Sequence, residues 1–561
     1  MNKLDYPNPI FIRENIEILD GKWDFSFDNN KWIDINVPFC PESKLSGIGY
    51  TDFIPKCYYK KKFIYKQIRE RLYLHFGAVD FATKVYINNQ FAGEHKGGYT
   101  PFSFDITNLV NIGKNEIFVD VQDDDLENQA RGKQSSQKNS FGCFYTRTTG
   151  IWQSVWLEYT AFDRIENFSF YPDIQNCSVD VDLRVSAKGK YEILVLFDNK
   201  IVGKANGDIA YRDKIYIPLS EKHLWSIGNG RLYDVIIKYG EDTVYSYFGL
   251  RSTAYNGMEY LLNGENIFQK LVLDQGYNPD GIYTAPNVAF MENDIDLAIN
   301  LGFNGSRLHQ KVFDPKFLYL CDKKGFMVWG EFPSWGIDYS SLDSCTQFLS
   351  EWKEVIERDF NHPCIVMWCP LNEVWENNEK NPDIKYIECV YDFTKILDET
   401  RPCVDVSGGY HSKKTDLFDF HCYQTIEDLK KYLDNLQKSD VLDVPLLYGK
   451  TIDIKYKKGC PVQISEFGGF AFFETKSNIG TVNEGAVKSE DAWGYGVKTD
   501  VLEIVNLVNL IYSYDKISGF CYTQLYDVEQ EQNGIYYYDR SEKISRETMK
   551  EIYNAIKFGR K

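Results

Sequence analysis

Glu373 and Glu466 are the two residues of this chain whose surroundings most clearly indicate chemistry. Each closes a short apolar run, at residues 364–373 and 461–466, and such runs are typical of buried parallel strands. In a barrel of parallel strands, catalytic side chains gather on the face formed by the carboxyl ends of the strands. Two carboxylates on that face predict glycoside cleavage, in which one acts as nucleophile and the other as acid and base.

The elements that must position these carboxylates begin at about residue 253, where strand and helix signals start to alternate. Asp314 and Pro315 are typical of a helix start, and Gly325 is typical of a helix end. Eight strand and helix units in about 300 residues predict a (β/α)8 TIM barrel over residues 253–561. The runs expected to form its strands are 268–274, 303–309, 326–331, 364–373, 403–407, 417–423, 461–466 and 517–524.

The first 252 residues follow a different pattern, because apolar and polar positions alternate there over short runs such as residues 81–90. This alternation predicts a β-sandwich at residues 1–160. The pattern continues in runs such as 191–197, and residues 161–252 fit a small immunoglobulin-like β-sandwich. A chain of 561 residues is long enough for these domains and the barrel.

Composition narrows the partners of the protein. The chain has 63 basic and 81 acidic residues, and its net charge of -18 disfavours nucleic acid and anionic membranes. No signal-like apolar run follows the N-terminus, and no stretch of about 18 apolar residues occurs, so we expect neither export nor a membrane span. Many of the 13 cysteines lie in apolar runs, where they act as small hydrophobic side chains, and a cytoplasmic location fits them best.

The sequence indicates no metal site and no required cofactor. It contains no CxxC, HxH or HExxH pattern, which are the spacings most typical of metal ligands. A divalent ion therefore has no support from ligand spacing.

Motifs along the chain carry a family resemblance. They include residues 77–102, 149–157 and 248–251, the pair Asn372-Glu373, and Glu466 within Ser-Glu-Phe-Gly. In this order they resemble glycoside hydrolase family 2, which contains β-galactosidases, β-glucuronidases and β-mannosidases. The resemblance covers essentially the whole chain and implies that the first sandwich is a jelly-roll sugar-binding domain. Further segments that resemble a less characterised subgroup are residues 131–134 and 522–531.

The resemblance also implies roles for site residues. Glu466 would attack the anomeric carbon, and Glu373 would serve as acid and then as base, so that the configuration is retained. Asn372 would hydrogen-bond the 2-hydroxyl of the sugar, and Tyr423 would donate a hydrogen bond to the nucleophile. The alternative of another class is a non-catalytic carbohydrate-binding protein, which would be expected to have lost a carboxylate, whereas both are present.

Further substrate-binding candidates lie at or after strand ends. Arg307 and His309 alternate with Leu308, so both can point into the mouth of the barrel. The resemblance implies that they support or contact the sugar. The remaining candidates are Asp274, Glu331 and Gln524 at strand ends, Trp493 on a loop, and Arg131 on the long loop before residue 150.

Two departures from the family bear on the substrate. β-Glucuronidases bind the sugar carboxylate with a late Asn-x-Lys motif, but residues 530–536 lack this lysine, so a uronide would require Arg131, Lys133 or Arg147. Where β-galactosidases carry an aspartate, this chain has Phe144. We expect a β-galactosidase-like, exo-acting enzyme on terminal β-linked sugars, with β-uronides and α-L-arabinosides as alternatives. Its partner would be an oligosaccharide or glycoside, and a homo-oligomer stays open.

Overall fold

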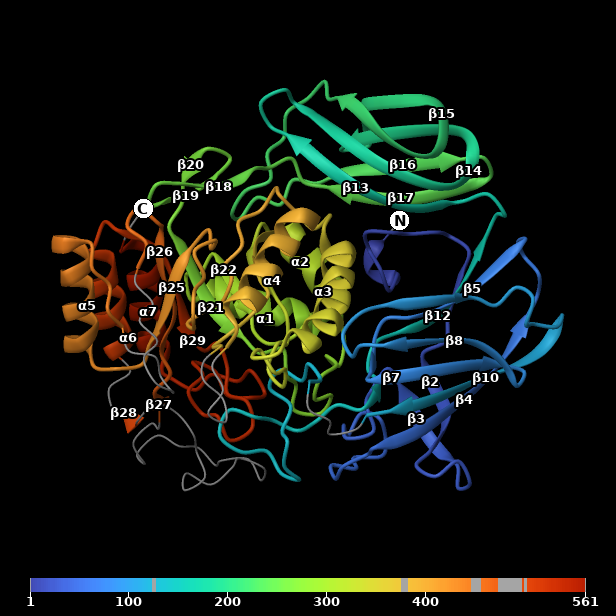
Figure 1. The fold of residues 1–561 in the computed structure, drawn as a ribbon, viewed down its shortest axis with the longest axis horizontal. Coiled ribbons are helices and arrows are strands. Elements are labelled where there is room, and N and C mark those ends of the chain that lie inside the picture. Colours follow the sequence, from blue (N-terminus) through green and yellow to red (C-terminus); the bar gives the residue numbers. More distant parts are fainter. Residues whose placement is uncertain are drawn as a thin grey trace.

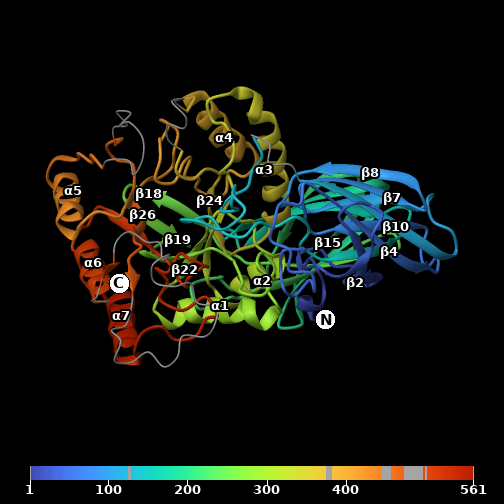
Figure 2. The ribbon, with the colours of Figure 1, turned by 90° about the horizontal axis from the view of Figure 1, so that it is seen from below.

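The computed structural model describes residues 2–123, 128–374, 382–444, 456–472, 497–498 and 502–559. Two antiparallel β-structures, blue and teal to green, pack against a parallel sheet that is covered by helices (Figure 1). The view from below shows the first β-structure beside the helix-covered sheet (Figure 2). None of the helices in the described ranges combines the length and apolar character needed to cross a membrane.

The first β-structure is a sandwich of strands that alternate between a core face and an outer face. In β10 (Gly113–Gln122), the buried Ile117, Val119 and Val121 alternate with partly exposed side chains, as the sequence predicts. One sheet has the order β1 (Ile16–Ile18), β12 (Val155–Thr160), β5 (Arg71–Phe76), β9 (Phe102–Asp105), and the other has the order β3 (Ile33–Val37), β2 (Gly21–Ser26), β4 (Lys56–Tyr65), β10, β7 (Ala82–Ile87), β8 (Gln90–Lys96). A separate short pair joins β6 (Val79–Asp80) to β11 (Gly150–Ile151).

The second β-structure contains two long strands, β14 (Ser178–Phe197) and β15 (Lys200–Pro218). The first part of β14 pairs with β13 (Ile165–Asp173) and its last part with β16 (Tyr233–Tyr239), which in turn pairs with β17 (Asp242–Phe248). These strands bury one apolar core of their own. A small sheet of β18 (Thr253–Asn256), β19 (Glu259–Leu262) and β20 (Glu265–Asn266) follows them. The domain limits at residues 160 and 252 stay predictions.

The parallel sheet contains seven of the eight predicted strands as regular elements. Their order is β24 (Ile365–Cys369), β23 (Met327–Glu331), β22 (Gly305–Leu308), β21 (Gln269–Asp274), β29 (Ile517–Thr523), β26 (Val462–Gly468) and β25 (Phe418–Cys422). Strands β21 to β26 are nearly all buried along their full length, which explains why they read as continuous apolar runs.

The remaining predicted strand, residues 403–407, is the fifth along the chain. It differs from the prediction because it forms only isolated parallel pairings. Cys403 pairs with Trp368, and Ser407 pairs with Asn372. Between them, Asp405 accepts a hydrogen bond from the N–H of Val406 at 2.9 Å, so the chain bends around a polar side chain instead of continuing a ladder. The segment still lies next to the end of β24, where it supports the site.

Helices follow the strands of the barrel. The predicted helix start is confirmed, since the Asp314 carboxylate accepts a hydrogen bond from the N–H of Lys316 at 2.7 Å, and α2 ends before Gly325 at φ 66°. The helices are α1 (Val288–Asn300), α2 (Pro315–Lys324), α3 (Cys345–Asp359), α4 (Ile384–Leu397), α5 (Ile426–Ser439), α6 (Glu503–Tyr512) and α7 (Arg546–Phe558), with short helical turns at η1 (Lys3–Asp5) and η2 (Leu342–Ser344) and a further short strand pair, β27 (Ala471–Phe472) with β28 (Val497–Lys498).

Candidate active site

Glu466 lies in β26 and is buried among hydrogen-bond donors. The guanidinium of Arg307 donates to its Oε1 at 2.8 Å, and the hydroxyl of Tyr423 donates to its Oε2. Burial alone would raise the pKa of Glu466, but His421 and Arg307 outweigh burial and hold that pKa below its ordinary value. Glu466 is therefore an ionised carboxylate at neutral pH, as a nucleophile must be.

Arg307, at the end of β22, joins several site residues. Besides Glu466, its guanidinium donates to Glu331 Oε2 at 2.7 Å and to the Asn372 side-chain oxygen. Glu331 also lies 3.0 Å from the Nδ1 atom of His309. Burial acts to raise the pKa of Glu331, yet Arg307 and His309 lower it to about 2. Both oxygens of Glu331 thus face protein groups.

Glu373 follows β24 in a left-handed backbone conformation, with φ 49°. Such a conformation costs about 1–2 kcal/mol for a residue with a Cβ atom. The bond from its N–H to the Ser407 carbonyl, at 2.7 Å, holds this turn in place. The segment at residues 403–407 therefore fixes where the Glu373 side chain emerges.

His421 lies between the two carboxylates. Its Nδ1 atom is 2.7 Å from Glu373 Oε1, and its Nε2 atom is 3.3 Å from Glu466 Oε1. One oxygen of each carboxylate and one nitrogen of His421 all lie within 4.8 Å of one another. Retaining glycosidases hold their two carboxyl groups about 5–5.5 Å apart, so this spacing suits a nucleophile and an acid/base rather than a pair with water between them.

His421 is not among the predicted site residues, although the sequence carries a signal for it. In a strand, residues two apart face the same side, so the histidine two positions before Tyr423 shares its direction. The structure adds a shift in pairing between Phe420 and His421, which places His421 directly opposite Glu466. A shift of this kind cannot be read from an apolar run.

Asn372 has one bonded and one unbonded side-chain atom. Its oxygen accepts from Arg307, whereas its buried Nδ2 atom has no hydrogen-bond partner among the described residues. Trp335, on the loop after β23, donates from its indole to the Asn372 carbonyl at 3.1 Å. A buried donor without a partner next to the carboxylates is suited to a substrate hydroxyl.

The other predicted residues lie at varied distances from this centre. Asp274 accepts hydrogen bonds from the hydroxyl of Tyr526 and the N–H of Gly276, and burial together with Asp294 raises its pKa to about 6. Gln524 bonds to the side chains of Gln275 at 2.8 Å and Asn533 at 2.7 Å. Arg131 lines a hollow together with Asp80 and Asp123, away from the carboxylate pair. Trp493 lies outside the described residues. Substrate contact by these four stays a prediction.

Within the described part of the chain, two clusters of side chains have a spacing that a metal ion could bridge. The first is Glu373, His421 and Glu466. There the Arg307 guanidinium already donates to Glu466, and a positive group at 2.8 Å opposes a second cation. The second is Asp322, His362 and Cys364, where burial raises the pKa of the Cys364 thiol well above its ordinary value. A protonated thiol is a poor metal ligand, so we assign hydrogen-bonding roles to both clusters.

A loop from the first sandwich covers the mouth of the barrel. The N–H of Arg131 donates to the Trp335 carbonyl at 2.8 Å, and Gln530 donates to the carbonyls of Gly142 and Phe144 at 2.8 and 3.0 Å. The hydroxyl of Tyr145 donates to the carboxylate of Glu531. The described part of this loop, residues 128–149, is therefore one wall of the site.

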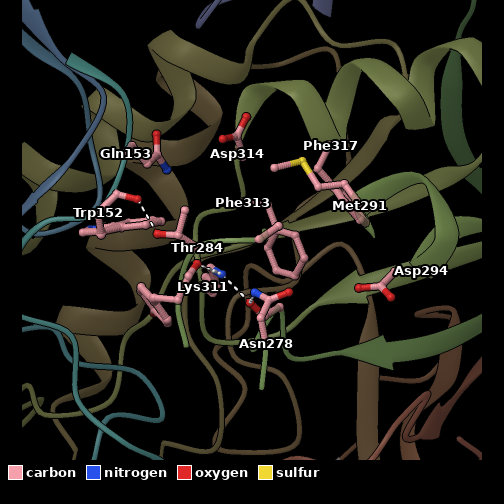
Figure 3. Close-up of a pocket in the computed structure, with 13 residues that line it drawn as sticks. Trp152, Gln153, Asn278, Thr284, Met291, Asp294, Lys311, Phe313, Asp314 and Phe317 are labelled. Atoms are coloured by element: carbon pink, nitrogen blue, oxygen red, sulfur yellow. Dashed lines mark hydrogen bonds between the residues drawn. The ribbon is translucent and has the colours of Figure 1, made fainter. Parts of the chain in front are cut away.

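A separate cavity of about 40 Å³ lies between the first sandwich and the barrel (Figure 3). Trp152 and Thr284 line one side of it, and Phe313 and Met291 line the other. Lys311 enters it and donates to the carbonyls of Gly276 and Tyr283. Neither Glu373 nor Glu466 lines this cavity, and its lysine is satisfied by the backbone.

Comparisons with known proteins identify the family of the chain. Residues 284–558 match the family described as "Glycosyl hydrolases family 2, TIM barrel domain", and residues 50–160 match its "sugar binding domain". The chain belongs to glycosyl hydrolase family 2. The predicted fold class, two β-sandwiches followed by a TIM barrel, is thereby confirmed, together with the family resemblance.

Individual relatives carry two different names. The chain is 28% identical to a beta-galactosidase of Thermoanaerobacter pseudethanolicus over 440 residues, which cover 72% of this chain and 56% of the relative. It is 24% identical to the human beta-glucuronidase over 467 residues, 72% of this chain and 71% of the relative. The solved beta-D-glucuronidase structure from Dictyoglomus thermophilum matches with a TM-score of 0.78 and 21% identity, covering 98% of both chains. The chain spans about half to three fifths of the first curated relatives it matches.

Proposed function

We propose that this chain is a retaining, exo-acting glycoside hydrolase that removes terminal β-linked sugar residues. The supporting observation is the pair Glu466 and Glu373. Glu466 is held ionised by His421 and Arg307 and accepts a hydrogen bond from Tyr423, and Glu373 lies within hydrogen-bond distance of His421. The two carboxylates have different partners, as their different roles require. The names of the relatives support a β-galactoside or a β-uronide as the substrate class, and an α-L-arabinoside is the further alternative.

The proposed reaction has two displacements. In the first, Glu466 attacks the anomeric carbon, the bond to the leaving oxygen breaks, and Glu373 gives a proton to that oxygen. In the second, Glu373 takes a proton from water, and the water oxygen displaces Glu466 from the same carbon. His421 is placed to exchange that proton with Glu373, and Asn372 Nδ2 is placed to bind the 2-hydroxyl as charge develops.

Hydrolysis of a panel of 4-nitrophenyl glycosides tests the proposal. The panel contains β-galactose, β-glucose, β-glucuronic acid, β-galacturonic acid, β-mannose and α-L-arabinopyranose, and kcat/KM is measured for each. We expect turnover of at least one member and a loss of at least about 10⁴-fold in Glu466→Gln, because that variant has no nucleophile. Activity that survives in Glu466→Gln would contradict the mechanism, and silence across the panel would favour carbohydrate binding without catalysis.

A second variant separates the two carboxylates. Glu373→Gln lacks the proton donor, so it should lose most activity on 4-nitrophenyl glycosides but retain the first step on 2,4-dinitrophenyl glycosides, whose leaving group needs no proton. Added azide, which attacks without a base, should then restore turnover and give a glycosyl azide of retained configuration. Inverted product would show that Glu466 does not form the covalent intermediate.

A further inference from the structure

Lys133 differs from the other buried cations at the mouth of the barrel. It is 6% exposed, and no hydrogen bond or ion pair joins its ammonium to any residue that the structure describes. By contrast, described cations nearby are bonded: Arg307 to Glu331, Lys311 to two carbonyls, Arg540 to Asp294, and Lys543 to Asp527. A buried ammonium has three donors and normally finds acceptors for them.

The surroundings of Lys133 direct this ammonium toward the site. It lies 5.0 Å from the centre of the Trp335 ring and 5.9 Å from that of Tyr145. Burial would lower the pKa of Lys133, but the acidic groups around it, first Cys143 and then Glu531, Glu466 and Glu373, keep that pKa raised. The ammonium is therefore charged and lies within the electrostatic reach of both carboxylates.

The two arginines of this loop are directed elsewhere. Arg147 donates to the backbone carbonyls of Thr51 at 2.6 Å and Lys138 at 3.3 Å, so it holds the loop together. Arg131 lines the hollow beside Asp80 and Asp123. The fourth cation of this loop, Lys138, pairs with Asp52. The Lys133 ammonium, by contrast, lies over the ring of Trp335, the residue that also contacts Asn372.

We propose that Lys133 binds the carboxylate of a β-linked uronic acid, so that the substrate class of this site is a β-uronide. This deepens the proposed function and rests on it. The indole N–H of Trp335 contacts Asn372, and the Lys133 ammonium lies 5.0 Å from the centre of the same ring. In a pyranose, C2 and C5 lie on opposite sides of the C1–O5 bond, so a sugar held against Trp335 can offer its 2-hydroxyl to Asn372 and its C5 carboxylate to Lys133. The ammonium also offsets the repulsion that Glu373, Glu466 and Glu531 exert on an anionic sugar.

Substrate pairs that differ only at C5 test this inference. We would measure kcat/KM for 4-nitrophenyl β-glucuronide against β-glucoside, and β-galacturonide against β-galactoside, in the wild type, in Lys133→Met and in Lys138→Met. Lys138 is the matched control, because it lies on the same loop but is exposed and pairs with Asp52 at 2.7 Å. We expect the wild type to prefer one uronide at least 100-fold, and Lys133→Met to lose at least 100-fold on it while changing at most threefold on the neutral partner.

Other results would overturn the inference without touching the proposed function. The wild type could prefer a neutral sugar, or the Lys133→Met variant could lose the same factor in kcat/KM on the uronide and on its neutral counterpart. Either result would leave Lys133 as a purely electrostatic support. Binding provides an assay that does not depend on turnover. Calorimetric titration of Glu466→Gln with D-glucuronate and D-galacturonate should show at least tenfold tighter binding than with glucose and galactose, and equal affinities would contradict a carboxylate site.

Discussion

At the scale of single residues, the site separates two carboxylates by their partners. Glu466 receives hydrogen bonds from Arg307 and Tyr423, whereas the contact described for the Glu373 carboxylate is with His421. Hydrogen bonds to a carboxylate stabilise its ionised form. The hydroxyl of Tyr423 should therefore matter for the pH range in which Glu466 can attack.

Tyr423→Phe tests this relation. Removing the hydroxyl takes one donor away from ionised Glu466, so its pKa rises relative to the wild type. The acid-side limb of kcat/KM against pH should move to higher pH, and kcat/KM at neutral pH should fall about 10- to 10³-fold. Tyr514→Phe is the control, because that hydroxyl donates to Asp434 on α5 at 2.9 Å. An unmoved acid limb in Tyr423→Phe would mean that the hydroxyl does not tune Glu466.

The sequence predicted part of this site for definite physical reasons. Glu373 and Glu466 are predicted because each closes an apolar run, and Arg307 because it stands at the end of another run. Tyr423 is predicted from the family resemblance. Contacts between elements leave no such pattern in the sequence. The bridging position of His421 and the choice of Lys133 among the four cations of its loop therefore required the fold. The polar interruption at Asp405 was hidden for the same reason, since residues 403–407 match a strand in composition.

At the scale of elements, the loop at residues 128–149 depends on close contact with the barrel. Gly132 adopts φ 58°, and a Cβ atom there would stand 2.3 Å from the Gln310 carbonyl oxygen and 2.9 Å from Pro333. Its N–H also lies 3.2 Å from the Pro333 carbonyl. A side chain at this position must therefore push the loop away from the mouth.

Gly132→Ala tests how tightly this wall must dock. Both this variant and Gly257→Ala place a Cβ at φ 58°, a strain of about 1–2 kcal/mol, but only Gly132 meets neighbouring atoms. We expect Gly132→Ala to lower kcat/KM at least about tenfold, because a small displacement of a binding wall is costly, and Gly257→Ala to leave it unchanged. Thermal unfolding monitors the shared strain. Equal kcat/KM in both variants would show that the loop is not part of the site.

At the scale of the whole molecule, Arg13 connects the two sandwiches. Its guanidinium donates to Glu158 in β12 at 2.8 Å and to Asp242 in β17 at 2.9 and 2.8 Å. Burial acts to raise the pKa of Glu158, but Arg13 and His75 lower it to about 2. These buried charges therefore link the stability of one sandwich to that of the other.

Acid titration of stability tests this connection. Because the folded pKa of Glu158 lies below its ordinary value, its contribution of roughly 3 kcal/mol is present above pH 4.5 and is lost as pH falls toward 2. Arg13→Met should cost about 3–5 kcal/mol at pH 7, and the gap to the wild type should shrink toward pH 3. Urea unfolding gives both values. The control is Arg212→Met, which breaks an exposed pair with Asp182 and should cost under about 1 kcal/mol. A gap that does not change with pH would contradict the linkage.

The loop that docks on the barrel mouth has a consequence for how such a protein can change. The carboxylates stand on one segment of the chain and a wall of their pocket on another, more than 200 residues earlier. Exchange of the first sandwich between relatives would replace this wall and leave the chemistry on its strands. The residues for the reaction and the residues for sugar preference are thereby encoded in different segments. Recombination can change the preferred sugar while the barrel keeps its carboxylates.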